Sequence, residues 1–197
     1  MSEQQKTIDF YFDIASPYSY FAACRVEQLG EKIGRRVNWL PLLLGGVFKA
    51  TGNKAPATVA AKARYLFVDL HRWAGALGIP FHFSSHFPPN TLTVQRVLCA
   101  LDPGQVPPVA AVLFTAFWAE QRNIADDKTL IAVLDDAGFD GAALVAQSAS
   151  DLVKQRLRHQ TDRAIERGVF GVPTVFVDDE MFWGHDRFDL IERLYAV

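Results

Sequence analysis

Apolar and polar residues alternate near the start of the chain and predict a strand followed by a helix. Residues 7–13 alternate and are rich in β-branched and aromatic side chains, which is typical of a strand. Ser16 and Pro17 follow, and a serine before a proline is a common helix start, with the serine as N-cap. Apolar residues then recur at helical spacing until Gly34, which predicts one continuous helix. The apolar stripe of this helix comprises Ala22, Val26, Leu29 and Ile33.

The middle of the chain changes from strand periodicity to helical periodicity. Residues 37–44 form a second strand-like run, and Pro41 within it indicates either an edge strand or a break in the strand. From residue 45 to residue 149 the apolar positions follow helical spacing, and segments rich in proline and glycine separate the helices. The apolar stripes of these helices are Leu66, Leu70, Trp73 and Leu77, then Val94, Val97, Leu98 and Leu101, then Val109, Val112, Leu113, Ala116 and Phe117, and finally Leu130, Ile131 and Leu134.

The last part of the chain returns to mixed structure. Residues 151–167 are expected to form a helix. Two short strands, residues 174–177 and 180–183, follow and are joined by a tight turn. Residues 184–186, Gly-His-Asp, then begin a final helix, and Asp186 is expected to cap it.

This order of elements matches the thioredoxin plan. A β-α-β half is followed by helices and then by a β-β-α half, and a proline opens the third strand. Val172 and Pro173 occupy that position, where the peptide bond of the thioredoxin plan is usually cis. We therefore predict an α/β, thioredoxin-like fold with a large inserted all-helical domain. Residues 1–44 and 168–197 are assigned to the thioredoxin-like domain, residues 45–150 to the helical insertion, and helix 151–167 bridges the two.

Composition and charge exclude several classes of function. The 197 residues contain 20 Lys+Arg and 22 Asp+Glu, and the resulting net charge of −2 argues against a nucleic-acid partner. Hydrophobic residues make up 50%, as in an ordinary globular protein with a sizeable core. The first residues lack the pattern of a secretory signal, and no apolar run approaches the roughly 18 residues of a membrane span. We expect neither a nucleic-acid nor a membrane partner.

Cysteine and histidine positions indicate neither a disulfide nor a metal site. Cys24 and Cys99 are not in a C-x-x-C or metal-ligand spacing, so we expect buried, free thiols in a reducing compartment and a cytoplasmic protein. The histidines show no ligand spacing either, and no metal is predicted.

The start of the first helix carries the candidate chemistry. A redox protein of the thioredoxin plan has C-x-x-C there, whereas this chain has Ser16-Pro17-Tyr18-Ser19. Dithiol exchange is excluded, because there is no thiolate to attack and none to resolve. A helix N-terminus still favours a thiolate that a ligand supplies, since its free N–H groups and dipole lower the thiol pKa. Ser16 is then placed to donate a hydrogen bond to the sulfur.

Four segments resemble the 2-hydroxychromene-2-carboxylate isomerase family. They are residues 9–22 (DFYFDIASPYSYFA), 52–56 (GNKAP), 64–81 (RYLFVDLHRWAGALGIPF) and 166–188 (ERGVFGVPTVFVDDEMFWGHDRF). That family is similar to kappa-class glutathione transferases and to DsbA-type oxidoreductases, which carry a helical domain inserted in a thioredoxin fold. The resemblance covers nearly the whole chain.

The resemblance implies that glutathione is the cofactor and that Ser16 is the catalytic residue, because Ser16 matches the serine that contacts the glutathione sulfur. Val172 matches the position whose backbone pairs with the cysteinyl part of glutathione, beside Pro173. Asn53 matches a residue that binds the tripeptide. His185 and Asp186 match the pair at the γ-glutamyl end. From their positions in the sequence, Tyr18 is a further candidate to cover the sulfur, and Lys62, Asn90 and Trp183 are candidate contacts to the substrate.

The activity that the resemblance implies is a glutathione-dependent interconversion of 2-hydroxychromene-2-carboxylate and trans-o-hydroxybenzylidenepyruvate, in the breakdown of naphthalene-like compounds. Transient addition of a thiolate to a conjugated carbon turns a double bond into a single bond, rotation follows, and expulsion of the thiolate gives the trans isomer. The implied partners are glutathione, a small aromatic acid and a second copy of the chain in a homodimer.

Two other functions are compatible with the same residues. One is a kappa-like glutathione transferase or peroxidase that acts on other electrophiles. The other is a non-catalytic module that binds peptides along the loop at Val172-Pro173, here called the proline loop. Each candidate residue also has an ordinary structural role open to it: Ser16 as a helix cap, Asn53 in a turn, Lys62 as a solvated charge, Asn90 near a helix start, and Trp183 in packing.

Overall fold

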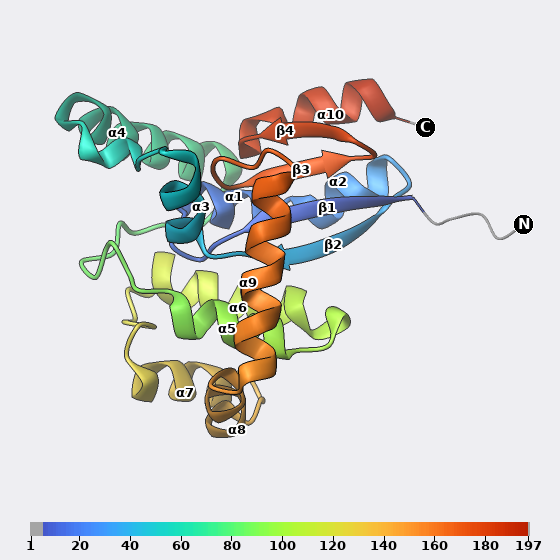
Figure 1. Cartoon of the computed structure of the whole chain (residues 1–197). Helices are drawn as coiled ribbons and strands as arrows, with labels where there is room; N and C mark the ends of the chain where they lie inside the picture. Colours follow the sequence, from blue (N-terminus) through green and yellow to red (C-terminus); the bar gives the residue numbers. More distant parts are fainter. Residues whose placement is uncertain (1–5, 197) are drawn as a thin grey trace, which may run out of the picture.

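A mixed four-stranded sheet forms the centre of the protein. The computed structural model describes residues 6–196. The strands are β1 (Thr7–Phe12), β2 (Arg36–Pro41), β3 (Thr174–Val177) and β4 (Glu180–Trp183), in the spatial order β2-β1-β3-β4 (Figure 1). β1 and β2 are parallel, with Ile8 opposite Val37. β3 is antiparallel to both of its neighbours, β1 and β4. The predicted thioredoxin-like sheet is confirmed, and β2 is an edge strand.

Helices cover both faces of the sheet and extend beyond it. Figure 1 shows α9 crossing in front of the sheet, α2 behind it, and α5–α8 gathered below it. The helices are α1 (Pro17–Ala23), α2 (Val26–Lys32), α3 (Leu44–Thr51), α4 (Ala60–Leu77), α5 (Leu92–Ala100), α6 (Val106–Trp118), α7 (Asp127–Asp136), α8 (Gly141–Ser148), α9 (Asp151–Glu166) and α10 (Phe188–Tyr195), with short 3₁₀ turns η1 (Pro56–Thr58), η2 (Pro103–Gln105) and η3 (His185–Arg187).

Alternation along β1 divides the interior into two clusters. Successive side chains of a strand point to opposite faces, and both faces of β1 are covered. Ile8, Phe10 and Phe12 are fully buried in the large cluster, which they share with residues of α1, α2, α5, α6 and α10. Tyr11 packs on the other face in a smaller cluster with α3, α9 and the proline loop. β1 is thus fixed from both sides, and its carboxyl end leads directly to Ser16.

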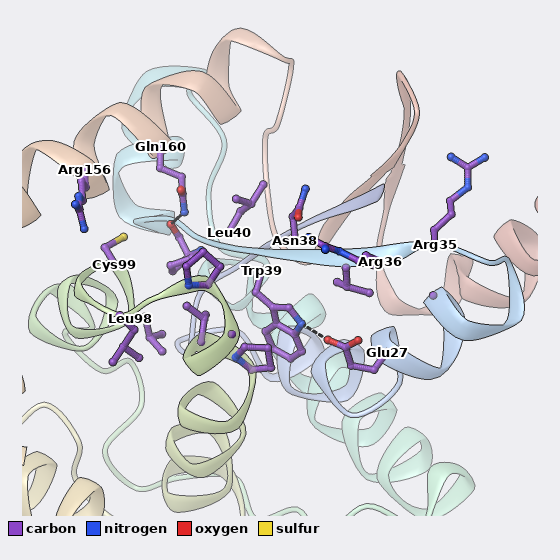
Figure 2. Close-up of a pocket in the computed structure, with 18 of the residues that line it drawn as sticks. Glu27, Arg35, Arg36, Asn38, Trp39, Leu40, Leu98, Cys99, Arg156 and Gln160 are labelled. Carbon is purple, nitrogen blue, oxygen red and sulfur yellow. Dashed lines mark hydrogen bonds between the residues drawn. The ribbon is translucent and has the colours of Figure 1, made fainter. Parts of the chain in front are cut away.

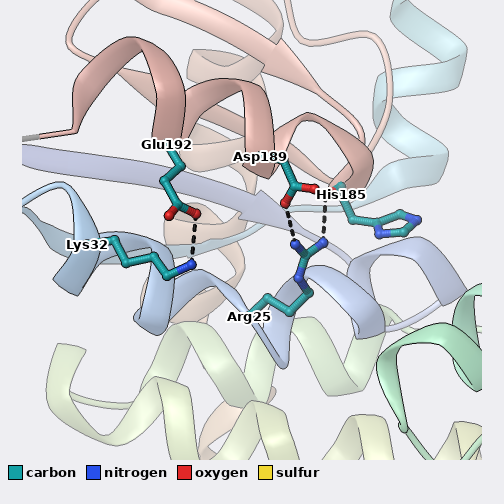
Figure 3. Close-up of polar contacts among 5 residues, drawn as sticks. All are labelled: Arg25, Lys32, His185, Asp189 and Glu192. Carbon is teal, nitrogen blue, oxygen red and sulfur yellow. Dashed lines mark hydrogen bonds and ion pairs between the residues drawn. The ribbon is translucent and has the colours of Figure 1, made fainter.

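The first predicted helix is two helices. Its apolar stripe is buried as expected, but α1 ends at Ala23 and α2 begins at Val26. At the break the Arg25 N–H donates to the carbonyl of Ala22, in a tighter turn than the α-helix allows. The turn directs the Arg25 guanidinium toward the start of α10, where Nη2 donates to Asp189 at 2.8 Å and Nη1 to the His185 carbonyl at 3.3 Å (Figure 3).

Three smaller expectations were wrong. Leu44 is the first residue of α3 rather than the end of β2, because its N–H donates to the buried carboxylate of Asp13 at 2.8 Å. Asp186 makes no capping bond, and the N-cap of α10 is Arg187. The two thiols are free, but Cys24 is exposed at the break after α1 and Cys99 is only partly covered.

Within residues 6–196 no helix has the length and apolar character needed to cross a membrane. The same residues contain no group of three or more His, Cys, Asp and Glu side chains that could hold a metal ion.

Candidate functional site

Ser16 joins the N-terminus of α1 to the proline loop. It is the N-cap of α1, and its Oγ accepts a hydrogen bond from the Ser19 N–H at 3.2 Å. The same hydroxyl donates to the Val172 carbonyl at 3.2 Å. The Val172-Pro173 peptide bond is cis, and the Pro173 carbonyl accepts the Gly184 N–H at 2.9 Å. One buried hydroxyl therefore holds together two segments that lie 156 residues apart in the sequence.

A cavity of about 600 Å³ opens in front of this junction. Among the residues that the sequence singled out, Ser16, Tyr18, Asn53, Lys62, Val172 and Trp183 line it. Pro173, His185 and Asp186 are not among the lining residues. Pro173 follows the lining residue Val172, the His185 ring stacks on Tyr18, and Asp186 lies in η3 beside His185. Asn90 lies outside it, where its side-chain oxygen accepts the Leu92 N–H at 3.2 Å at the start of α5.

Tyr18 forms one wall of the cavity and is held from behind. Its hydroxyl donates to Asp69 Oδ2 at 2.6 Å, and its ring stacks on the imidazole of His185 with ring centroids 5.3 Å apart. Partial burial and the carboxylate of Asp69 raise the pKa of Tyr18 well above its usual value. The hydroxyl therefore stays protonated at neutral pH, and the ring has a fixed orientation.

His185 is enclosed by aromatic rings at the start of η3. Its ring lies against Tyr18, Phe21 and Trp73, the last with ring centroids 4.5 Å apart, and it is 2% exposed. Burial lowers the pKa of His185 to about 4, so the imidazole is neutral at physiological pH. Its Nδ1 has no hydrogen-bond partner among the described residues. Asp186 points outward, with its carboxylate exposed and 3.6 Å from the guanidinium of Arg187.

Asn53 and Trp183 border the proline loop from two sides. Asn53 Nδ2 donates to the Phe170 carbonyl at 2.8 Å, which ties the end of α3 to the segment before Pro173. The indole of Trp183 lies over Gly171, where a Cβ would come within 2.9 Å of Trp183 Nε1. Trp183 is half exposed, so one side of its ring faces the opening.

Several lining residues were not singled out from the sequence. They bring a second cation and most of the apolar wall, and the main ones are Leu44, Phe48, Lys54, Tyr65, Leu66 and Phe87. Tyr65 and Leu66 lie at i+3 and i+4 from Lys62, on the same face of α4. This helical spacing could have identified them from the sequence. No local pattern pointed to Phe87, which comes from the loop before α5.

Asp13 was also missed and orders the backbone under Ser16. Its carboxylate is 1% exposed and accepts hydrogen bonds from the Ala15 N–H, the Leu44 N–H and the Thr91 hydroxyl, at 3.0, 2.8 and 2.8 Å. Burial raises the pKa of Asp13, and the three donors act in the opposite direction. This side chain joins the starts of α1, α3 and α5, and the first two of these helices line the cavity.

Taken together, the cavity combines a helix N-terminus, a buried hydroxyl, two lysines and an apolar wall. The cations Lys54 and Lys62 suit carboxylate groups, and the apolar wall suits a flat ring. Within residues 6–196 no cysteine lines the cavity, so a thiol reacting at the N-terminus of α1 has to arrive with a ligand.

Comparison with known proteins gives a consistent result. Residues 7–196 match the family model described as a DSBA-like thioredoxin domain. The chain is 36% identical to a 2-hydroxychromene-2-carboxylate isomerase of Pseudomonas putida, over 94% of this chain and 92% of that protein. A solved structure of 2-hydroxychromene-2-carboxylate isomerase superposes with a TM-score of 0.86 at 34% identity, over 95% and 93% of the two chains. Glutathione S-transferase kappa 1 of Rattus norvegicus is 27% identical, over 98% of this chain and 92% of that protein.

Proposed function

The chain belongs to the DSBA-like thioredoxin domain family and, within it, to the 2-hydroxychromene-2-carboxylate isomerases, and from this premise we propose its function. It is an isomerase that interconverts 2-hydroxychromene-2-carboxylate and trans-o-hydroxybenzylidenepyruvate with glutathione as cofactor. The observation that carries the proposal is the Ser16 hydroxyl, which is buried between the N-terminus of α1 and the Val172 carbonyl at the mouth of a cavity that no cysteine of residues 6–196 lines.

The residues around the cavity fit glutathione. Ser16 offers a hydroxyl and α1 offers its positive end, which together suit a thiolate. Lys54 suits a carboxylate of glutathione, and Asp186, which is exposed outside the cavity lining, suits its ammonium group. The Ser19 hydroxyl is fully buried near the same helix end and has no partner among the described residues.

When bound, glutathione supplies the thiolate that adds reversibly to a conjugated carbon of the substrate. The protein supplies position and charge. Ser16, whose hydroxyl donates to the Val172 carbonyl, would donate to the sulfur of bound glutathione and so lower the thiol pKa from its usual range. Val172 lines the cavity next to the cis bond, and we assign to its backbone the pairing with an extended ligand.

The apolar wall and Lys62 orient the substrate. Phe48, Leu66, Phe87 and Trp183 form the sides of a slot for an aromatic ring, and they exclude water from the reacting carbons. Lys62 lies on the first turn of α4, where its ammonium is placed to hold the substrate carboxylate. Tyr18 closes the slot over the sulfur position, and its bond to Asp69 keeps the ring there.

The proposal includes a cytoplasmic homodimer. The two free thiols suit a reducing compartment. Several apolar side chains of α4 are exposed, among them Tyr65 at 62%, Phe67 at 50% and Val68 at 45%, and a second copy would cover this face. Sedimentation velocity checks the mass, and a monomer at micromolar concentration contradicts this part.

The experiment that tests the function follows the absorbance of 2-hydroxychromene-2-carboxylate with and without glutathione. We expect conversion that requires glutathione, and a glutathione complex measurable by titration calorimetry. An equal rate of conversion with and without glutathione, or the absence of any glutathione binding, contradicts the proposal.

A second candidate is a kappa-like glutathione transferase, which the 27% identity to the rat enzyme favours. The same cavity serves both reactions, because both need a bound thiolate beside an apolar slot. Steady turnover of chlorodinitrobenzene without isomerisation of the chromene acid selects the transferase.

A further inference from the structure

A groove of about 1080 Å³ follows the free edge of β2, away from the cavity at Ser16 (Figure 2). One wall is α9, with Arg156, His159 and Arg163. The other wall combines α2 with the apolar segment between α5 and α6, including Leu101 and Val106. We propose that this groove binds an extended acidic segment of a partner protein as an added strand beside β2.

The backbone of β2 is prepared for such pairing. In a parallel ladder the N–H and C=O of one residue point to the same neighbour, and alternate residues point to opposite sides. The N–H groups of Arg36 and Leu42 donate to carbonyls at the two ends of β1, at 3.4 and 3.0 Å, so the even positions face β1. The odd positions, Val37, Trp39 and Pro41, therefore face the groove.

The outer edge is closed at one end and open along the rest. Gln160 Nε2 of α9 donates to the Pro41 carbonyl at 2.6 Å, and proline has no N–H to offer. No hydrogen bond from any described residue reaches the outward N–H and C=O groups of Val37 and Trp39. Free edge groups of this kind pair readily with another extended chain, and proteins normally cover or blunt them.

The charges on the α9 wall define the partner. Arg156 and Arg163 are exposed and form no ion pair with any residue between 6 and 196, and Arg36 adds a third such cation at the edge itself. On the opposite wall Glu27 accepts the Trp39 Nε1–H at 2.6 Å, which holds its carboxylate in place without neutralising it (Figure 2). Glu31 adds a second carboxylate on the same wall, so the positive charge of the groove is concentrated on α9 and at Arg36. The excess of positive charge on the α9 wall complements an acidic chain.

Strand geometry also predicts the pattern of the partner. Alternate side chains of an added strand point to opposite walls. Every second residue meets the arginines of α9, and the residues between them meet Leu101, Val106 and their apolar neighbours. The matching segment alternates acidic and apolar residues. A second copy of this chain fits less well, because two β2 edges side by side would bring Arg36 against the same cationic edge.

The test uses a fluorescein-labelled peptide of alternating Glu and Val, with fluorescence anisotropy as the readout. We expect saturable binding that weakens at high salt, and no binding of the matching Lys-Val peptide. The double substitution R156Q/R163Q is expected to weaken binding about tenfold, since two charge-assisted contacts are lost. Arg158→Gln is the control, because Arg158 lies on the same helix, pairs with Asp162 and does not line the groove.

Two further measurements distinguish strand pairing from charge attraction alone and from self-association. N-methylation of alternate peptide residues is expected to abolish binding in one register, because it removes the N–H donors that pair with β2. Unchanged affinity of the methylated peptide shows a charge-only site and overturns the proposal. A dimer in sedimentation that R156Q/R163Q dissociates assigns the groove to a second copy and overturns it as well. Isomerase activity is expected to stay within experimental error in R156Q/R163Q and in Arg158→Gln.

Discussion

The cavity at Ser16 and the groove along β2 are both large hollows beside the same sheet, and they differ in what lines them. The cavity of about 600 Å³ has a buried hydroxyl, a helix N-terminus and an apolar wall. The groove of about 1080 Å³ has exposed arginines and a free backbone edge. The smaller hollow holds groups fixed in one orientation, which catalysis needs, whereas the larger one offers charge and backbone, which suit a flexible chain.

Removal of the Ser16 hydroxyl is expected to have the largest effect, because it changes the cavity and leaves the groove along β2 unchanged. Ser16→Ala is expected to lower kcat/KM by about a hundredfold, as for removal of a hydrogen bond to a developing anion. Loss of the cap costs about 1 kcal/mol of stability. The measurements are the glutathione-dependent absorbance assay and thermal unfolding.

Ser150→Ala is the matched control for Ser16→Ala. Ser150 caps α9 by accepting the Val153 N–H at 3.4 Å, far from the cavity. We expect the same loss of stability and full activity. Equal losses of activity in the two variants would show that capping alone explains the role of Ser16.

A histidine lies in each region, and we expect only the histidine beside the cavity, His185, to make the stability of the protein depend on pH. The pKa of His185 is lowered by burial to about 4, so the unfolded chain takes up a proton at a higher pH than the folded protein does. The contribution of His185 to the free energy of unfolding is therefore complete above the unfolded pKa of about 6.5 and is lost as pH falls from there toward 4. The free energy of unfolding is expected to fall by about 2 kcal/mol between pH 7 and pH 5.

His185→Asn removes this pH dependence, whatever its effect on absolute stability. His159→Asn is the control, because His159 is exposed in the groove. The measurement is the melting temperature across pH 5 to 7. A slope that His185→Asn leaves unchanged would contradict the assignment.

Two glycines test how tightly each region is packed. A Cβ on Gly171 would lie 2.9 Å from Trp183 Nε1, so Gly171→Ala displaces the indole from the proline loop. We expect kcat/KM to fall about tenfold, mainly through KM, since the slot for the ring is reshaped. Gly104 lines the groove with no atom of the described residues within 4 Å of its Cβ position, and Gly104→Ala is expected to change neither activity nor stability measurably.

The smallest expected effect concerns Lys62. Lys62→Gln removes one exposed cation from the cavity and is expected to raise KM for the anionic substrate about threefold, with kcat unchanged. Lys128→Gln on α7 is the control for a general change in charge. The KM of the wild type is expected to rise with salt, and that of Lys62→Gln to rise less. Identical salt curves would remove Lys62 from substrate binding.

Local sequence patterns predicted the structure correctly where the residues of a single helix or strand determine its bounds. The two final strands, Thr174–Val177 and Glu180–Trp183, have the predicted bounds, and Ser16 caps α1 through its own side chain. The break at Arg25 was missed because the apolar stripe continues across it, and the partner that Arg25 meets there, Asp189, lies 164 residues away. Leu44 was misplaced for a similar reason, since Asp13 captures its N–H.

The sequence alone determined the thioredoxin-like order of elements, the absence of a C-x-x-C pair, Ser16 as the cap of the first helix and Val172-Pro173 before the third strand, because spacing, capping and motif residues act over a few positions. Only the tertiary structure decided that Asp69 holds Tyr18, that aromatic rings enclose His185, and that Asn90 stays outside the cavity. It also decided that the outward backbone groups of Val37 and Trp39 have no hydrogen-bond partner among the described residues. These features arise where segments distant in sequence meet, and their energies come from burial and contacts that no short pattern contains.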